Sequence, residues 1–76
     1  MAASPAQDAT NKELAAAVCD AIQSLPDDQR TVTILFEYED QSHADIAAVL
    51  GCTAKAVENK LHRARQFLRH KLASWL

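Results

Sequence analysis

The C-terminal third of this 76-residue chain carries the pattern that most constrains its fold. Six apolar residues recur there at alternating spacings of four and three: Val57, Leu61, Ala64, Leu68, Leu72 and Trp75. These spacings place side chains on one face of an α-helix. Polar and basic residues occupy the opposite face. The pattern predicts one long amphipathic helix, and the rest of the chain must supply the apolar surface that it packs against.

Two further helices are predicted in the N-terminal half. Thr10 and Glu13 have the spacing of a capping box, which would begin a helix at about Asn11. Pro26 suits the first turn of a second helix, and the two acidic residues after it favour the positive N-terminal end of that helix. Residues 1–9 are small, polar and aperiodic, so we predict a disordered leader there and a folded domain over residues 10–76.

The segment of residues 32–38 is rich in residues that favour strands and could be read as one. It follows a helix-start signal directly, and the chain offers no second strand to pair with it. A lone strand would leave its backbone groups unsatisfied. We therefore predict that this segment continues the second helix, which makes the fold class all-α.

A short helix and a turn precede the long helix. Ser42 and Asp45 form a second capping-box pattern, and Gly51 can adopt the left-handed conformation that ends a helix. Thr53 can cap the helix that follows. Two helices joined by a three-residue turn with a glycine indicate a helix-turn-helix. We expect a small four-helix domain with this motif at about residues 43–72.

Charge is divided unevenly along the chain. Residues 1–50 have a balance of −7, and residues 51–76 a balance of +5, although the net charge is only −2. The hydrophobic content of 49% excludes a disordered chain, and no apolar run approaches the roughly 20 residues that span a bilayer. The basic end is suited to an anion such as DNA.

Cys19 and Cys52 lie far apart and are predicted to be small buried residues in a reducing compartment.

The outward face of the long helix could enter the major groove of DNA. Arginine, asparagine and glutamate are the side chains that read guanine, adenine and cytosine edges. The plainer alternative is a helical bundle whose last helix is basic for solubility. No nucleophile with an adjacent base, no glycine-rich phosphate loop and no metal-ligand spacing can be read, so we expect neither an enzyme nor a cofactor. The residues expected to face the groove are Lys55, Glu58, Asn59, His62 and Arg63.

Three segments resemble the C-terminal domain, or region four, of bacterial sigma factors of the extracytoplasmic-function class. They are Leu25-Pro26-Asp27-Asp28-Gln29-Arg30, then Ser42-His43-Ala44-Asp45-Ile46-Ala47 with Leu50-Gly51-Cys52, and finally Ala56-Val57-Glu58-Asn59-Lys60-Leu61-His62-Arg63-Ala64-Arg65. The resemblance covers roughly residues 14–72. It implies a cytoplasmic domain that recognises the minus-35 promoter element and docks on the β-subunit flap of RNA polymerase. It also implies an anti-sigma factor as a possible partner.

The resemblance assigns roles to individual residues. Asn59, His62 and Arg63 match base-contacting positions, and we add Glu58 to this set because it lies on the same face. Glu58 stands where many relatives carry Lys or Arg, so the base read there is open. The residues predicted to contact phosphates are Arg30, Lys55, Lys60 and Arg65.

Two rival functions remain at this stage. A response-regulator domain of the LuxR type shares the Ile-Ala-x-x-Leu-Gly pattern, but its last helix is normally shorter and lacks the Arg-x-Arg run. A protein-interaction domain, in which the acidic and apolar first half captures an anti-sigma factor or another regulator, is the second. The part of a sigma factor that melts the minus-10 element does not occur in these 76 residues.

Overall fold

The computed structural model describes the backbone of residues 5–75 and the side chains of residues 11–75. Within that part of the chain there are four α-helices, one final 3-10 turn and no strand. The all-α, four-helix prediction is confirmed, and residues 32–37 are helical rather than extended. The elements are α1 (Pro5–Gln23), α2 (Asp27–Glu37), α3 (His43–Leu50), α4 (Ala54–Lys71) and η1 (Ala73–Trp75).

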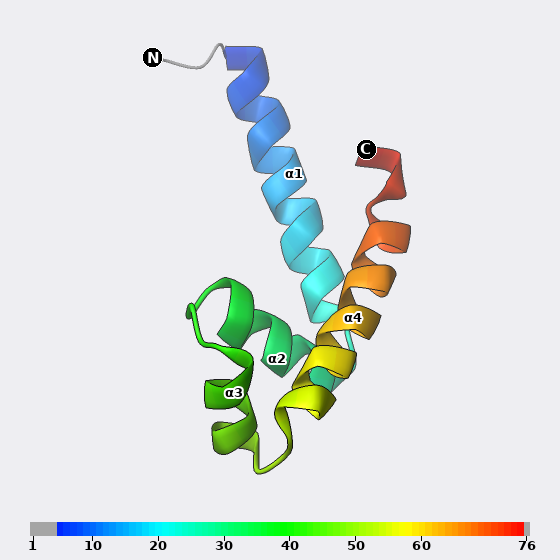
Figure 1. The fold of residues 1–76 in the computed structure, drawn as a ribbon. Helices are drawn as coiled ribbons and strands as arrows, with labels where there is room; N and C mark the ends of the chain where they lie inside the picture. The colour runs from blue at the N-terminus through cyan, green and yellow to red at the C-terminus, as the bar shows by residue number, and fades with distance from the viewer. Residues whose placement is uncertain (1–4, 76) are drawn as a thin grey trace.

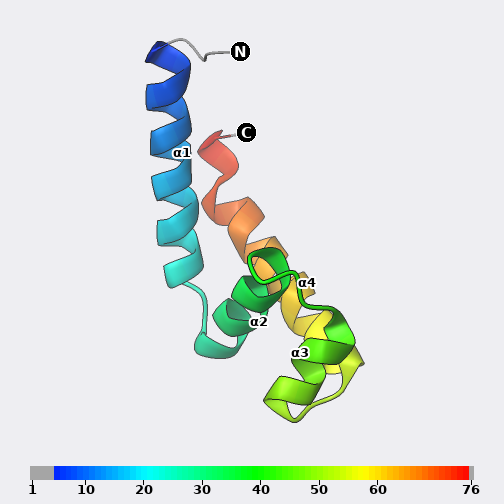
Figure 2. The same cartoon turned by 90° about the vertical axis from the view of Figure 1, so that its left-hand side faces the viewer.

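Helices α2, α3 and the first half of α4 pack together at one end of the molecule (Figures 1 and 2). Helix α1 meets this group through its C-terminal part, and its N-terminal half extends away from it. The Cα radius of gyration is therefore 14.6 Å, against about 11 Å for a compact chain of this length. The helix-turn-helix lies in the compact part, at the end remote from both termini (Figure 1).

Two apolar clusters hold the helices together. The first joins α2, α3 and α4 through Val32, Ile46, Ala47, Val57 and Leu61. The second joins α1 to α4 through Ile22, Leu25 and Ala64, with partly buried residues around them. Helix α4 contributes to both clusters, because its apolar face is long enough to contact the other three helices in turn. The predicted apolar face of the long helix is thus confirmed from Val57 to Leu68.

Two residues in the left-handed region of backbone conformation turn the chain between helices. Gly51 ends α3 with φ 67°, as predicted, and the Cys52 amide donates to the Ala47 carbonyl. Asp40 has φ 54° after α2, and the Gln41 amide donates to the Leu35 carbonyl. The Cys52–Ala47 bond spans six residues, as in a Schellman ending, in which glycine usually occupies the left-handed position, whereas the Gln41–Leu35 bond spans seven.

The start of α1 differs from the prediction. The helix begins at Pro5 and not at about Asn11, so it overlaps residues 5–9 of the predicted leader. Proline fits the first turn of a helix because its missing amide has no partner there anyway, and Pro5 is therefore the better start signal. Residues 1–4 lie outside the described residues, and the division of the chain into leader and domain stays a prediction.

The expectations about the burial of the cysteines and of Trp75 were wrong. Cys19 is exposed on α1 and Cys52 is only half-buried, and both are free thiols. Trp75 is 40% exposed, because α4 ends at Lys71 and the chain tightens into η1, which moves Trp75 out of the helical register. Leu14 is 37% exposed, since it lies on the part of α1 that extends from the core.

Candidate nucleic-acid interface

Local hydrogen bonds cap the N-terminal ends of both helices of the helix-turn-helix, α3 and α4. The Ser42 hydroxyl accepts from the Asp45 amide at 3.1 Å, and the Asp45 carboxylate accepts from the Ser42 amide at 3.4 Å. The Thr53 hydroxyl accepts from the Ala56 amide at 3.0 Å and so caps α4. The predicted caps at Ser42 and Thr53 are confirmed. These caps determine the residues at which α3 and α4 start, and so the bounds of the two helices and of the turn between them.

Burial determines which face of α4 is free. Val57, Leu61 and Ala64 are at most 2% exposed and face the other helices. The five residues predicted to face the groove are all exposed on α4: Lys55, Glu58, Asn59, His62 and Arg63. The helix-turn-helix therefore presents a polar surface on its second helix, and we call these five residues the outer face. Whether they contact bases stays a prediction.

The N-terminal end of α4 is unusual in charge. Helices α2 and α3 carry aspartates in their first turns, whereas α4 has no acidic residue there. Lys55 occupies that turn, and its Nζ lies 3.5 Å from Oε2 of Glu58. The positive end of a helix favours acids and disfavours lysine. The charge at the start of α4 is therefore poorly suited to helix stability and well suited to an anion outside the protein.

Each of the four predicted phosphate ligands lies near acidic side chains of the protein, and three of them, Arg30, Lys55 and Arg65, form ion pairs. Arg30 donates to Asp27 Oδ1 and to the Gln23 carbonyl, which ties the start of α2 to the end of α1. Lys60 is half-buried beside the acidic start of α2, where it lines a hollow of about 330 Å³ with Asp27 and Asp28. Of the four, only Lys55 belongs to the outer face. Phosphate contacts by all four stay predictions.

Arg65 points towards α2. Its guanidinium lies 3.6 Å from the Glu37 carboxylate and 5.6 Å from the centre of the Phe36 ring. The same ring also lies against His43, whose ring centre is 5.1 Å away. His43 is half-buried at the start of α3. The sequence analysis missed this cluster because its members lie on three different helices.

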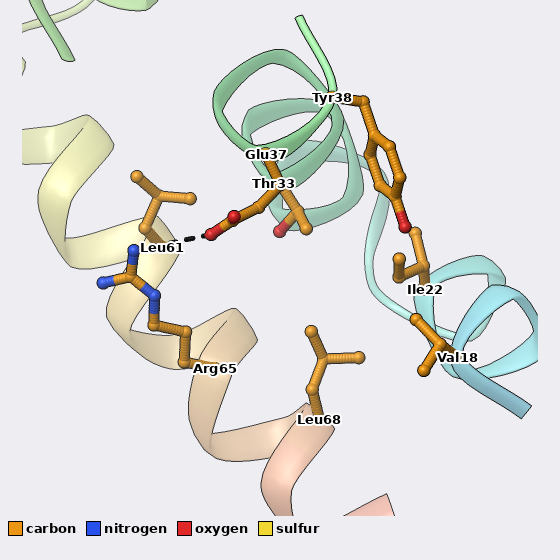
Figure 3. A pocket seen from close by; sticks show the side chains of 8 residues that line it. All are labelled: Val18, Ile22, Thr33, Glu37, Tyr38, Leu61, Arg65 and Leu68. Atoms are coloured by element: carbon orange, nitrogen blue, oxygen red, sulfur yellow. Dashed lines mark ion pairs between the residues drawn. The ribbon is translucent and has the colours of Figure 1, made fainter. Parts of the chain in front are cut away.

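A shallow apolar groove lies beside the Arg65–Glu37 ion pair (Figure 3). Side chains from three helices and from the residue after α2 line it: Val18 and Ile22 of α1, Thr33 and Glu37 of α2, Tyr38 just after it, and Leu61, Arg65 and Leu68 of α4. Its volume is about 240 Å³. The buried Thr33 hydroxyl donates to the Gln29 carbonyl within α2 and adds no unpaired donor to the groove. This surface is separate from the outer face of α4.

Two other kinds of site are not found among residues 11–75. No helix in the described part of the chain is long and apolar enough to cross a membrane. Among the described side chains, no three of His, Cys, Asp and Glu gather where they could bind a metal ion. The outer face of α4 and the groove are the candidate binding surfaces.

The fold and its exposed second helix define a helix-turn-helix domain of the DNA-binding type. Residues 15–68 match the family described as sigma-70, region 4, and the chain belongs to that family. This membership does not favour the LuxR-type alternative. It also agrees with the resemblance seen in the three sequence motifs, and the family is one of non-enzymatic transcription factors.

Several curated relatives support this membership. The chain is 34% identical over 68 residues to an ECF RNA polymerase sigma-E factor of Haemophilus influenzae, which covers 90% of the chain and 36% of that protein. It is 40% identical over 63 residues to an RNA polymerase sigma-H factor of Pseudomonas aeruginosa, a match that covers 83% of the chain and 33% of that protein. It is 38% identical over 72 residues to an RNA polymerase sigma-E factor of Streptomyces coelicolor, a match that covers 93% of the chain and 41% of that protein. The chain thus spans only about a third to two fifths of these relatives.

Proposed function

We propose that this chain recognises the minus-35 element of promoters as the DNA-binding domain of an alternative sigma factor, in transcription initiation in the cytoplasm. The observation that carries the proposal is the outer face of α4. It combines five exposed polar side chains with a helix held firmly by Val57 and Leu61 on its other side. A rigid helix with a free polar face fits the major groove, where base edges are read. Asn59, His62 and Arg63 are the proposed base contacts, with Glu58 beside them.

Selection from a library of randomised duplexes tests this role. The 76-residue chain should enrich one short motif at low salt, and Arg63→Glu should abolish the enrichment. Lys12→Glu on α1 is the matched control, because it makes the same charge change at an exposed position away from α4. If Lys12→Glu impairs selection as much as Arg63→Glu does, the effect is one of net charge and the outer face is not the interface.

The second proposed partner is the RNA polymerase core, through the flap of its β subunit, and the groove between α1, α2 and α4 supports it. The groove is apolar and open, which suits a protein segment better than DNA. An anti-sigma factor that covers the same groove is a further proposal of the same kind. Co-purification with core polymerase tests the first: Val18→Glu in the groove should weaken it, whereas Val49→Glu, 65% exposed on α3, should not. Equal retention of both variants would contradict the groove as the docking site.

A further inference from the structure

Lys55 and Glu58 form an ion pair in the first two turns of α4, with 3.5 Å between Nζ and Oε2. Both side chains are largely in solvent, at 74% and 56% exposure. From this pair we infer that Glu58 reads a cytosine in the major groove and that Lys55 neutralises its charge for that purpose. The inference rests on the proposed promoter recognition and specifies one of its base contacts.

Helix stability does not account for the pair. A lysine three residues before a glutamate is the less favourable order for a helical ion pair, and the start of a helix is the less favourable end for a lysine. An exposed pair of this kind contributes little to stability in any case. We therefore attribute the positions of the two charges to binding of a partner outside the helix.

Lys55 neutralises the negative charge of Glu58, which would otherwise be repelled by DNA. An isolated carboxylate on a DNA-facing helix is repelled by the phosphates, which lowers affinity for every sequence alike. With the lysine ammonium 3.5 Å away, the pair has no net charge. Glu58 can then approach the groove without a general loss of binding.

The carboxylate chooses the base by its hydrogen-bonding type. An ionised glutamate only accepts hydrogen bonds, and the 3.5 Å separation from Lys55 exceeds the roughly 2.7–3.2 Å of an N–H···O bond, so its oxygens stay available. In the major groove cytosine presents an amino donor, whereas guanine presents two acceptors and thymine one. Adenine places an acceptor beside its amino group, which repels the carboxylate. Cytosine is therefore the base that Glu58 accepts best.

Duplex selection with the parent chain and Glu58→Gln tests this inference directly. The parent should favour cytosine at one position by about fivefold or more over the other bases. Glutamine donates and accepts, as adenine requires, so Glu58→Gln should change the preference at that position alone to adenine. Glu13→Gln on α1 is the matched control, because it removes one exposed carboxylate and should leave the whole profile unchanged.

A double-mutant cycle tests the role of Lys55. Lys55→Met should reduce affinity at least about threefold more in the parent than in Glu58→Gln, because only the parent has a charge to neutralise. If the parent and Glu58→Gln select the same motif with the same base at every position, the inference is wrong and the proposed function stands. Equal losses from Lys55→Met in both backgrounds would overturn the neutralising role. If the parent enriches no motif at all, promoter recognition by this chain fails and the inference fails with it.

Discussion

The guanidinium carbon of Arg65 lies 5.6 Å from the centre of the Phe36 ring, and one of its nitrogens lies 3.6 Å from a Glu37 carboxylate oxygen. Arg65 thus joins α4 to the C-terminal end of α2 by a cation–π contact and an ion pair. Phe36 also contacts His43, the first residue of α3. This arginine therefore lies at the point where the three helices of the compact part meet.

Replacing Arg65 with alanine should lower the free energy of unfolding by about 0.5–1.5 kcal/mol. An exposed cation–π contact contributes about 0.5–1 kcal/mol and an exposed ion pair about 0.2–1 kcal/mol. Urea denaturation followed by circular dichroism measures the change. Arg63→Ala, two residues away on the outer face, is the control and should stay within about 0.5 kcal/mol of the parent. Equal stability of the two variants would mean that Arg65 has no structural role.

Gly51→Val should destabilise the domain by about 1–3 kcal/mol through backbone strain alone. Gly51 has φ 67°, and a Cβ built there meets nothing within 4 Å, so the cost comes from the left-handed backbone and not from a clash. Gly51→Asn is the matched variant, because asparagine tolerates this conformation. Thermal melts should rank the parent first, then Gly51→Asn, then Gly51→Val. A melting temperature of Gly51→Val equal to that of the parent would contradict the role of the turn.

Binding to a duplex should depend steeply on salt. If about four basic side chains neutralise phosphates, the slope of log K against log salt is about −3 to −4 by counterion release. A slope near −1 would instead mean that only Lys55 neutralises a phosphate and that Arg30, Lys60 and Arg65 stay at their positions against α2 when DNA binds. Fluorescence anisotropy at several salt concentrations provides the measurement. Affinity that does not change with salt would contradict groove docking.

Arg63→Ala and Lys55→Ala should have different effects on sequence preference. The planar guanidinium of arginine can bond two acceptors of one guanine, so Arg63→Ala should cost about 1–3 kcal/mol on the selected duplex and relax one base pair. Lys55→Ala should weaken binding to selected and scrambled duplexes alike and flatten the salt slope by about one unit. Titration of both variants against both duplexes separates these effects. If Arg63→Ala weakens both duplexes equally, Arg63 contacts only phosphate.

The sequence by itself determined the features that depend on neighbours within a few residues. The caps at Ser42 and Thr53, the left-handed Gly51 and the apolar face of α4 are signals of this local kind, and the structure contains all of them. The exposed outer face of α4 follows from them, because burying one side of a helix leaves the opposite side in solvent.

Only the tertiary structure decided the partners of side chains at the edges of that face. Lys60 and Arg65 lie on either flank of α4, where helical spacing indicates a direction but not what lies there. Because α2 packs across α4, the acidic start of α2 lies beside Lys60. The end of α2, with Phe36 and Glu37, lies beside Arg65. The exposure of Cys19 likewise depends on how α1 leaves the core. Such contacts join residues far apart in the chain, so they arise only when the helices have packed.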